Sequence, residues 1–133
     1  WNDQGDGASA VALIDFQDAT VAHPIYDVAS LLRDARIDID RDIQASLLAH
    51  AARTIAMEES RARFAFDVLS FQRNLRILGV FHRAAIRDQK TQHLIHAPRV
   101  RQHLVDAAQN PDLSDLAALI DAALPVVQPV HSA

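Results

Sequence analysis

The sequence predicts a mainly α-helical protein in which a short β-hairpin is followed by a helical subdomain. Alanine and leucine abound, whereas only three of the 133 residues are glycine and five are proline, a balance that favours helix. Half of the residues are hydrophobic, so the chain is expected to fold around a core. From Pro24 onward, apolar residues recur with the 3.6-residue period of an α-helix.

The hairpin is expected at the N-terminal end. Residues 10–14 (AVALI) are a short apolar run of strand-forming type beside Asp-Gly pairs, which indicates a buried strand. Trp1 and Asn2 are expected to end the preceding strand, with residues 3–7 as the hairpin loop. Because natural proteins rarely begin at such a polar turn, we expect the sequence to be a piece of a longer chain.

Five helices are expected after the hairpin. Pro24 suits the start of the first helix, an aspartate caps the second, and Asn110-Pro111 separates the last two. Their expected ranges are Tyr26 to Arg36, Asp38 or Asp40 to about Met57, Ser60 to Arg87, Pro98 to about Gln109, and Asp112 or Ser114 to just before Pro125. One domain is therefore expected, with a hairpin and loop in residues 1–18, helices in 24–124 and a frayed tail in 125–133.

The hydrophobic pattern also predicts which helical faces are buried. The third helix carries one apolar stripe with helical spacing, and the second carries another formed by Ile43, Leu47, His50 and Ala51. We expect the core to join the third helix to the first two, through Phe64, Val68, Phe71, Leu75 and Leu78 packed against Leu31, Leu32 and Leu47.

Composition excludes several classes of function. The net charge is −4, and no basic stripe with interleaved aromatic residues is present, so nucleic acid is not an expected partner. No apolar run approaches the roughly 20 residues that cross a bilayer, so no membrane contact is expected. There is no cysteine, which excludes disulfide and thiolate chemistry and suits a reducing, cytoplasmic compartment.

Asp15 is the sharpest candidate for chemistry. It stands at the carboxyl end of the predicted strand and is followed by a loop, a place from which a carboxylate can reach a cleft. Mg²⁺ bound to nucleotide phosphates usually takes one or two such oxygen ligands from protein. An aspartate at a strand end can equally well cap a turn, and three residues alone favour that simpler interpretation.

The longer pattern resembles the aminoglycoside phosphotransferase family. The resemblance lies in residues 13–19 (LIDFQDA) and 24–32 (PIYDVASLL), which follow the order of an aliphatic pair, Asp-Phe, an acidic residue, a loop and an Asp-Leu-Ala helix. Within that family, residues 31–36 (LLRDAR) and 72–81 (QRNLRILGVF) and the Pro98-Arg99-Val100 start of a helix are similar to bacterial anomeric kinases of N-acetylmuramate and N-acetylglucosamine.

This resemblance implies the C-terminal part of a protein-kinase-like fold that uses ATP and Mg²⁺. It gives Asp15 the role of binding the metal on the nucleotide phosphates. Substrate contacts are expected from Gln17, Asp18, Arg73 and Asn74. Asp18 could instead hold its loop, and Arg73 and Asn74 could lie on a solvated helix face. The acceptor is expected to be a hydroxyl, most specifically the anomeric hydroxyl of an amino sugar in cell-wall recycling.

Two departures from the family pattern matter. His23 stands where relatives commonly have glycine, and the family's His-x-Asp-x-x-x-x-Asn catalytic loop is absent. The catalytic aspartate is therefore expected upstream of Trp1, and the chain alone is expected to be inactive. The family's nucleotide-binding lobe is expected to be missing too, and without it exposed apolar groups near Trp1 should promote self-association.

Two alternatives remain open on the sequence. The acceptor could be an aminoglycoside, choline or homoserine, or the chain could be a helical binding module without chemistry. The seven histidines, among them His82, His93, His96 and His103, have no assigned role. The i, i+3 spacing of His93 and His96 lacks the further cysteine or acidic ligands of a zinc site.

Overall fold

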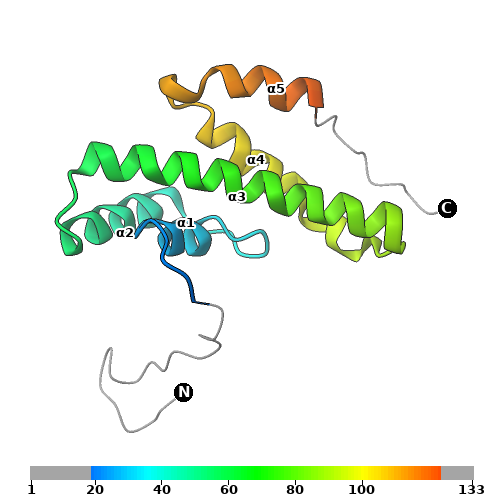
Figure 1. Ribbon diagram of the computed structural model, residues 1–133, viewed down its shortest axis with the longest axis horizontal. Coiled ribbons are helices and arrows are strands. Elements are labelled where there is room, and N and C mark those ends of the chain that lie inside the picture. The colour runs from blue at the N-terminus through cyan, green and yellow to red at the C-terminus, as the bar shows by residue number, and fades with distance from the viewer. Residues whose placement is uncertain (1–18, 124–133) are drawn as a thin grey trace, which may run out of the picture.

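The computed structural model describes residues 19–123, and every regular element within that range is helical (Figure 1). The elements are α1 (Tyr26–Leu32), α2 (Arg41–Thr54), α3 (Glu59–Asp88), the 3₁₀ helix η2 (Thr91–His96), α4 (Ala97–Ala107), the 3₁₀ helix η3 (Pro111–Leu113) and α5 (Asp115–Ala123). The mainly helical prediction is confirmed. The predicted hairpin lies outside the described residues, as does the predicted tail.

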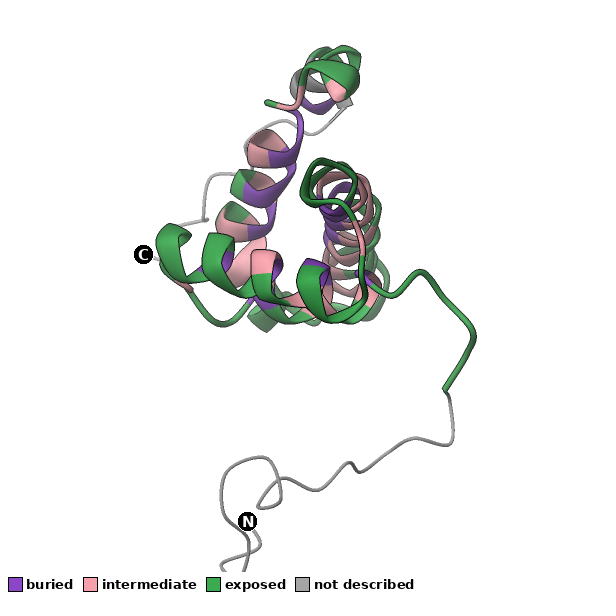
Figure 2. Ribbon diagram, turned by 90° about the vertical axis from the view of Figure 1, so that its left-hand side faces the viewer, coloured by how far each residue is buried: buried purple, intermediate pink, exposed green. Residues whose placement is uncertain are grey.

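The 30-residue helix α3 is the axis of the fold. In Figure 1, α1 and α2 lie along one side of it, α4 packs along it, and α5 crosses beyond α4. Figure 2 shows the buried positions of these helices turned toward one another and the exposed positions turned outward. Helices from both ends of the described chain thereby pack around α3.

Local capping signals set most of the helix boundaries. Asp40 caps α2, where its carboxylate accepts hydrogen bonds from the backbone N–H groups of Asp42 and Ile43 at 2.8 and 3.4 Å. Glu58 caps α3 in the same way, and α3 ends at Asp88, followed by Gln89, whose φ of 54° lies in the left-handed region. The sequence did not predict η2, and α1 ends at Leu32, four residues before the predicted end.

The core differs from the predicted one. Four of its expected members remain substantially exposed: Leu31 at 63%, Leu47 at 43%, Phe64 at 43% and Leu75 at 40%. On α2 the buried positions are Gln44, Leu48 and Ala52, one residue around the helix from the predicted stripe. The prediction of the buried face of α2 was therefore wrong, and on α3 only Phe71 and Leu78 of the expected stripe are buried.

Small side chains explain this difference. The face of α3 that packs on α1 and α2 contains Ala62, Phe66 and Ser70, and it meets Ala29 and Ala52. The buried face of α3 therefore combines Phe66 with small side chains, whereas Phe64 and Leu75 stay partly exposed. A second buried cluster joins α3 to α4 and α5 through Ala35, Phe71, Leu78, Val100, Leu104, Ala107, Ala108 and Ile120.

Candidate functional site

The residues predicted to form a site fall into two groups. Asp15, Gln17 and Asp18 lie outside the described residues, whereas Arg73 and Asn74 lie in the middle of α3. The structure therefore describes the helical region that follows the motif at residues 15–18 in the chain. Asp15 is eight residues from His23, which borders a hollow of the helical region.

Asn74 is an interior residue. It is fully buried, and its Nδ2 donates a 2.8 Å hydrogen bond to the backbone carbonyl of Ser70, one turn earlier. Its Oδ1 is buried without a hydrogen-bond partner among the described residues. The alternative that Asn74 lies on a solvated face is thus wrong, because the surrounding helices cover the position. The hydrogen bond from Arg36 lowers the pKa of Asp34 to about 2, and the charge of the half-buried Arg73 adds to that effect.

A buried ionic network links α1 to α4. The guanidinium of Arg33 donates a 3.0 Å hydrogen bond to Asp106 Oδ2 and lies 3.3 Å from Nδ1 of His103. Asp106 Oδ1 also accepts from Arg41 at 3.1 Å and from Gln102 at 2.9 Å. Both partners of the central pair are largely buried, with side-chain exposures of 12% and 8%.

Beside this network lies a polar hollow of ≈ 460 Å³. We use the name "polar hollow" for the space bordered by Arg33, Arg41, Gln44, Ala45, Leu48, Arg63, Phe66, Asp67, Asp106, Gln109, Asn110 and Pro111. It brings three guanidinium groups and two carboxylates together with side-chain amides. Such a lining offers donors and acceptors in the combination that a compound with many hydroxyl groups requires.

Asp67 gives the polar hollow its most perturbed carboxylate. Burial raises the pKa of Asp67, and the hydrogen bond from Asn110 together with the charges of Arg63 and Arg33 only partly opposes that rise. Nδ2 of Asn110 donates to Asp67 Oδ2 at 2.9 Å, while Oδ1 of Asn110 accepts from the backbone N–H of Asp112. Asn110 therefore ties α3 to the start of η3.

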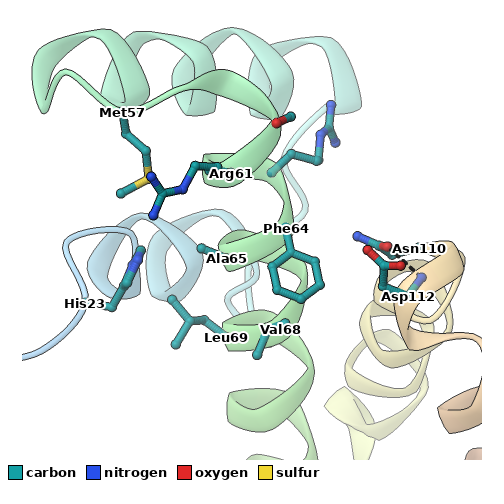
Figure 3. Close-up of a pocket in the computed structure, with 11 residues that line it drawn as sticks. His23, Met57, Arg61, Phe64, Ala65, Val68, Leu69, Asn110 and Asp112 are labelled. Atoms are coloured by element: carbon teal, nitrogen blue, oxygen red, sulfur yellow. Dashed lines mark hydrogen bonds between the residues drawn. The ribbon is translucent and has the colours of Figure 1, made fainter.

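A second hollow is mainly apolar (Figure 3). We use the name "apolar groove" for this space of ≈ 640 Å³, bordered by His23, Met57, Ser60, Arg61, Arg63, Phe64, Ala65, Val68, Leu69, Asn110 and Asp112. The side chain of Phe64 stands in the middle of it, between His23 and Asn110. The groove and the polar hollow are neighbours, because Arg63 and Asn110 border both.

The described histidines form no metal centre. Within residues 19–123 no three His, Cys, Asp or Glu side chains are grouped as metal ligands would be. His93 and His96 instead contact the ring of Phe81, at centroid distances of 5.7 and 6.4 Å. His103 is buried beside Arg33, and burial followed by that neighbouring charge lowers its pKa.

Comparison with known proteins gives the family. Residues 1–66 match the phosphotransferase enzyme family, and relatives match over most of the chain. The chain belongs to the phosphotransferase enzyme family. The N-acetylmuramate/N-acetylglucosamine kinase of Caulobacter vibrioides is 33% identical over 127 residues, 95% of this chain and 35% of the relative. The kinase of the same name from Pseudomonas aeruginosa is 33% identical over 121 residues, 85% of this chain and 36% of the relative.

A third relative extends this agreement. The protein of the same name from Neisseria meningitidis is 31% identical over 99 residues, 69% of this chain and 30% of the relative. The chain thus spans about a third of the length of the curated relatives it matches. None of the helices within residues 19–123 combines the length and hydrophobicity that a membrane crossing requires.

The family match covers the motif and part of both hollows. Residues 1–66 include Asp15, Gln17 and Asp18, then His23, α1, α2 and the first turns of α3. The polar hollow joins that region to α4, a relationship that the sequence analysis missed. One signal was available, since Arg33 falls on the apolar face of the first predicted helix, where a buried arginine needs an acidic partner.

Proposed function

We propose that this chain is the C-terminal part of an ATP-dependent kinase that phosphorylates a hydroxyl group of a small molecule. The acceptor we propose is the anomeric hydroxyl of an amino sugar of the N-acetylmuramate/N-acetylglucosamine type. One observation carries the proposal: relatives named as kinases of these sugars match 95% and 85% of the chain at 33% identity. A match of that extent includes the helices as well as the motif.

Asp15 is the proposed metal ligand. A carboxylate at a strand end is the kind of oxygen donor that Mg²⁺ prefers, and Mg²⁺ on nucleotide phosphates would neutralise charge during transfer. We propose that Gln17 and Asp18, which follow directly, approach the acceptor or hold the loop that presents Asp15. The chain contains no His-x-Asp-x-x-x-x-Asn, so a catalytic base would have to come from outside these 133 residues.

We propose that the polar hollow contributes to the acceptor site. Its carboxylates and amides suit a sugar, whose hydroxyls both donate and accept hydrogen bonds. Asp67→Asn keeps the shape of the side chain and removes the charge, so it should raise the KM for the acceptor about tenfold, the scale of one hydrogen bond to a charged group. Asp88→Asn, at the exposed end of α3, is the matched control and should leave KM unchanged.

Substrate contacts by Arg73 and Asn74 stay predictions. Neither residue borders the polar hollow or the apolar groove, and Asn74 is fully buried between the helices. The test is the same kinetic measurement on Arg73→Ala and Asn74→Ala. A raised KM for the acceptor with an unchanged KM for ATP supports a contact, and lost stability with unchanged kinetics assigns the residue to the core.

The experiment that tests the proposed function is a panel of acceptors. The full-length protein is incubated with ATP, Mg²⁺ and either N-acetylmuramate, N-acetylglucosamine, an aminoglycoside, choline or homoserine, and ADP formation is measured. We expect turnover with the amino sugars and a product phosphorylated at the anomeric position. Turnover only with another acceptor would support the proposed kinase activity and refute the amino sugar as its acceptor. If no ADP forms with any of these acceptors, a binding module without chemistry would be favoured.

A further inference from the structure

The apolar groove continues as a stripe along α3. Phe64, Val68 and Leu75 are four and seven residues apart, so they lie on one side of the helix. Phe64 and Leu75 are 43% and 40% exposed, although both belong to the hydrophobic pattern that predicted the core. From Phe64 to Leu75 the stripe is about 16 Å long, at 1.5 Å per residue. Within the described part of the chain, Phe64 and Leu75 are therefore only partly covered.

The chain itself enters at the edge of this groove. His23 borders it, and the backbone N–H of Ile25 donates to Nδ1 of His23 at 3.2 Å, which holds the ring at the start of α1. Phe16 precedes His23 by seven residues, a span of no more than about 25 Å. Residues 10–14, if extended, span about 14 Å from the first to the last Cα atom, close to the length of the stripe.

The chemistry of the two surfaces is complementary. Residues 10–14 carry only apolar side chains, as does the floor of the groove at Phe64, Ala65 and Val68. Arg61 and Arg63 border the groove, and the segment that follows residues 10–14 is acidic, with Asp15 and Asp18. Apolar burial would supply the free energy, while opposite charges at the rim would set the direction of the segment.

We propose that residues 10–16 of the same chain dock on the apolar groove of α3 and cover Phe64 and Val68. This contact would hold Asp15 beside Arg63 and Asn110, the two residues that the groove shares with the polar hollow. The docking is a contact within the chain and does not depend on kinase activity. The docking would give the helical region a role beyond its own packing, because it would position the proposed metal-binding motif at Asp15.

The absence of cysteine makes a direct test possible. Leu13→Cys is combined with Val68→Cys in one variant of the 133-residue chain and with Ile86→Cys in the control. Ile86 is 82% exposed and lies about 27 Å from Val68 along α3. Both variants are oxidised at low protein concentration, and intramolecular disulfide is measured by non-reducing electrophoresis and peptide mass spectrometry.

We expect the Leu13–Val68 pair to close at least about tenfold faster than the control pair, because disulfide formation requires closely placed Cβ atoms. Equal rates for the two pairs would overturn the proposal. Disulfide-linked dimers in place of the intramolecular product would overturn it too, because a second copy would then occupy the groove. Circular dichroism confirms that each reduced variant is folded.

Hydrogen exchange provides a second measurement without cysteines. Phe64→Asp places a charge in the groove and should increase amide exchange in residues 10–16 severalfold. Leu47→Asp is the matched control, because Leu47 on α2 is also 43% exposed, and it should leave that exchange unchanged. Exchange in residues 10–16 that is equally fast in the unmodified chain and both variants would contradict the docking.

Discussion

Arg33 and Asp106, which are 73 residues apart in the sequence, form a largely buried ion pair at 3.0 Å. The pair joins the end of α1 to the last turn of α4 across α3, and the guanidinium lies 5.5 Å from the centre of the Phe66 ring. The carboxylate of Asp106 accepts hydrogen bonds from Arg33 at the end of α1, Arg41 at the start of α2 and Gln102 of α4. One carboxylate therefore connects α4 to the end of α1 and the start of α2.

Removing that carboxylate should be costly. In Asp106→Ala the buried guanidinium of Arg33 loses its counter-charge, and we expect unfolding to become easier by about 3–5 kcal/mol. Arg41→Ala removes a 74% exposed partner of the same carboxylate and should cost less than about 1 kcal/mol. Urea denaturation followed by circular dichroism measures both. Equal losses for the two variants would show that Arg33 is not the partner that matters.

Acid should destabilise the fold through His103. Because burial and the charge of Arg33 lower its pKa, the folded protein binds a proton at this ring less readily than the unfolded chain does. The contribution of His103 is therefore present above its ordinary pKa and is lost as the pH falls through the lowered value. The facing groups are Arg33, Asp106, Arg99 and the backbone of Asp34.

The measurement is the free energy of unfolding between pH 8 and pH 5, compared with His103→Gln. We expect the loss between these pH values to be smaller in the variant, because glutamine does not titrate. His50→Gln, at an exposed position of α2, is the control and should follow the unmodified chain. A His103→Gln curve parallel to that of the unmodified protein would contradict the assignment.

Asp67 should act in the opposite direction. Its pKa is raised by burial, so the stability it contributes is present below the ordinary pKa of aspartate and is lost as the pH rises through the higher folded value. Asp67→Asn should therefore stabilise the chain at pH 7 and change little near pH 3. The hydrogen bond from Asn110 survives if the asparagine carbonyl accepts it. A less stable variant at pH 7 would mean that the arginines nearby outweigh the burial.

The helices could be predicted because their boundaries depend on local chemistry. Asp40 at a helix start, Pro98 in a first turn and Asn110 before Pro111 each act within a few residues, and all three signals were confirmed. The buried faces could not be predicted in the same way. Choosing between Phe64 and Phe66 depends on which side of α3 faces the other helices, and the residues that bury Phe66 come from α1 and α2.

The candidate site was less accessible to sequence reasoning for a related reason. The polar hollow is formed by residues of α2, α3 and α4 together with Arg33 after α1 and the segment that leads into η3, and no short motif indicates that they meet. The motif at residues 15–18 was recognisable because its residues are consecutive, and the family match over residues 1–66 agrees with it. Its role and its position relative to α3 remain predictions, which the disulfide test and the following measurement address separately.

The most direct test of the central claim is the turnover number of Asp15→Asn in the full-length protein, with N-acetylmuramate or N-acetylglucosamine, ATP and saturating Mg²⁺. Loss of the proposed metal ligand should lower turnover at least about a hundredfold, since charge neutralisation acts mainly in the transition state. Asp27→Asn, at an exposed position in the first turn of α1, is the matched control and should retain its rate. Near-normal turnover of Asp15→Asn would contradict the assignment of Asp15 as metal ligand.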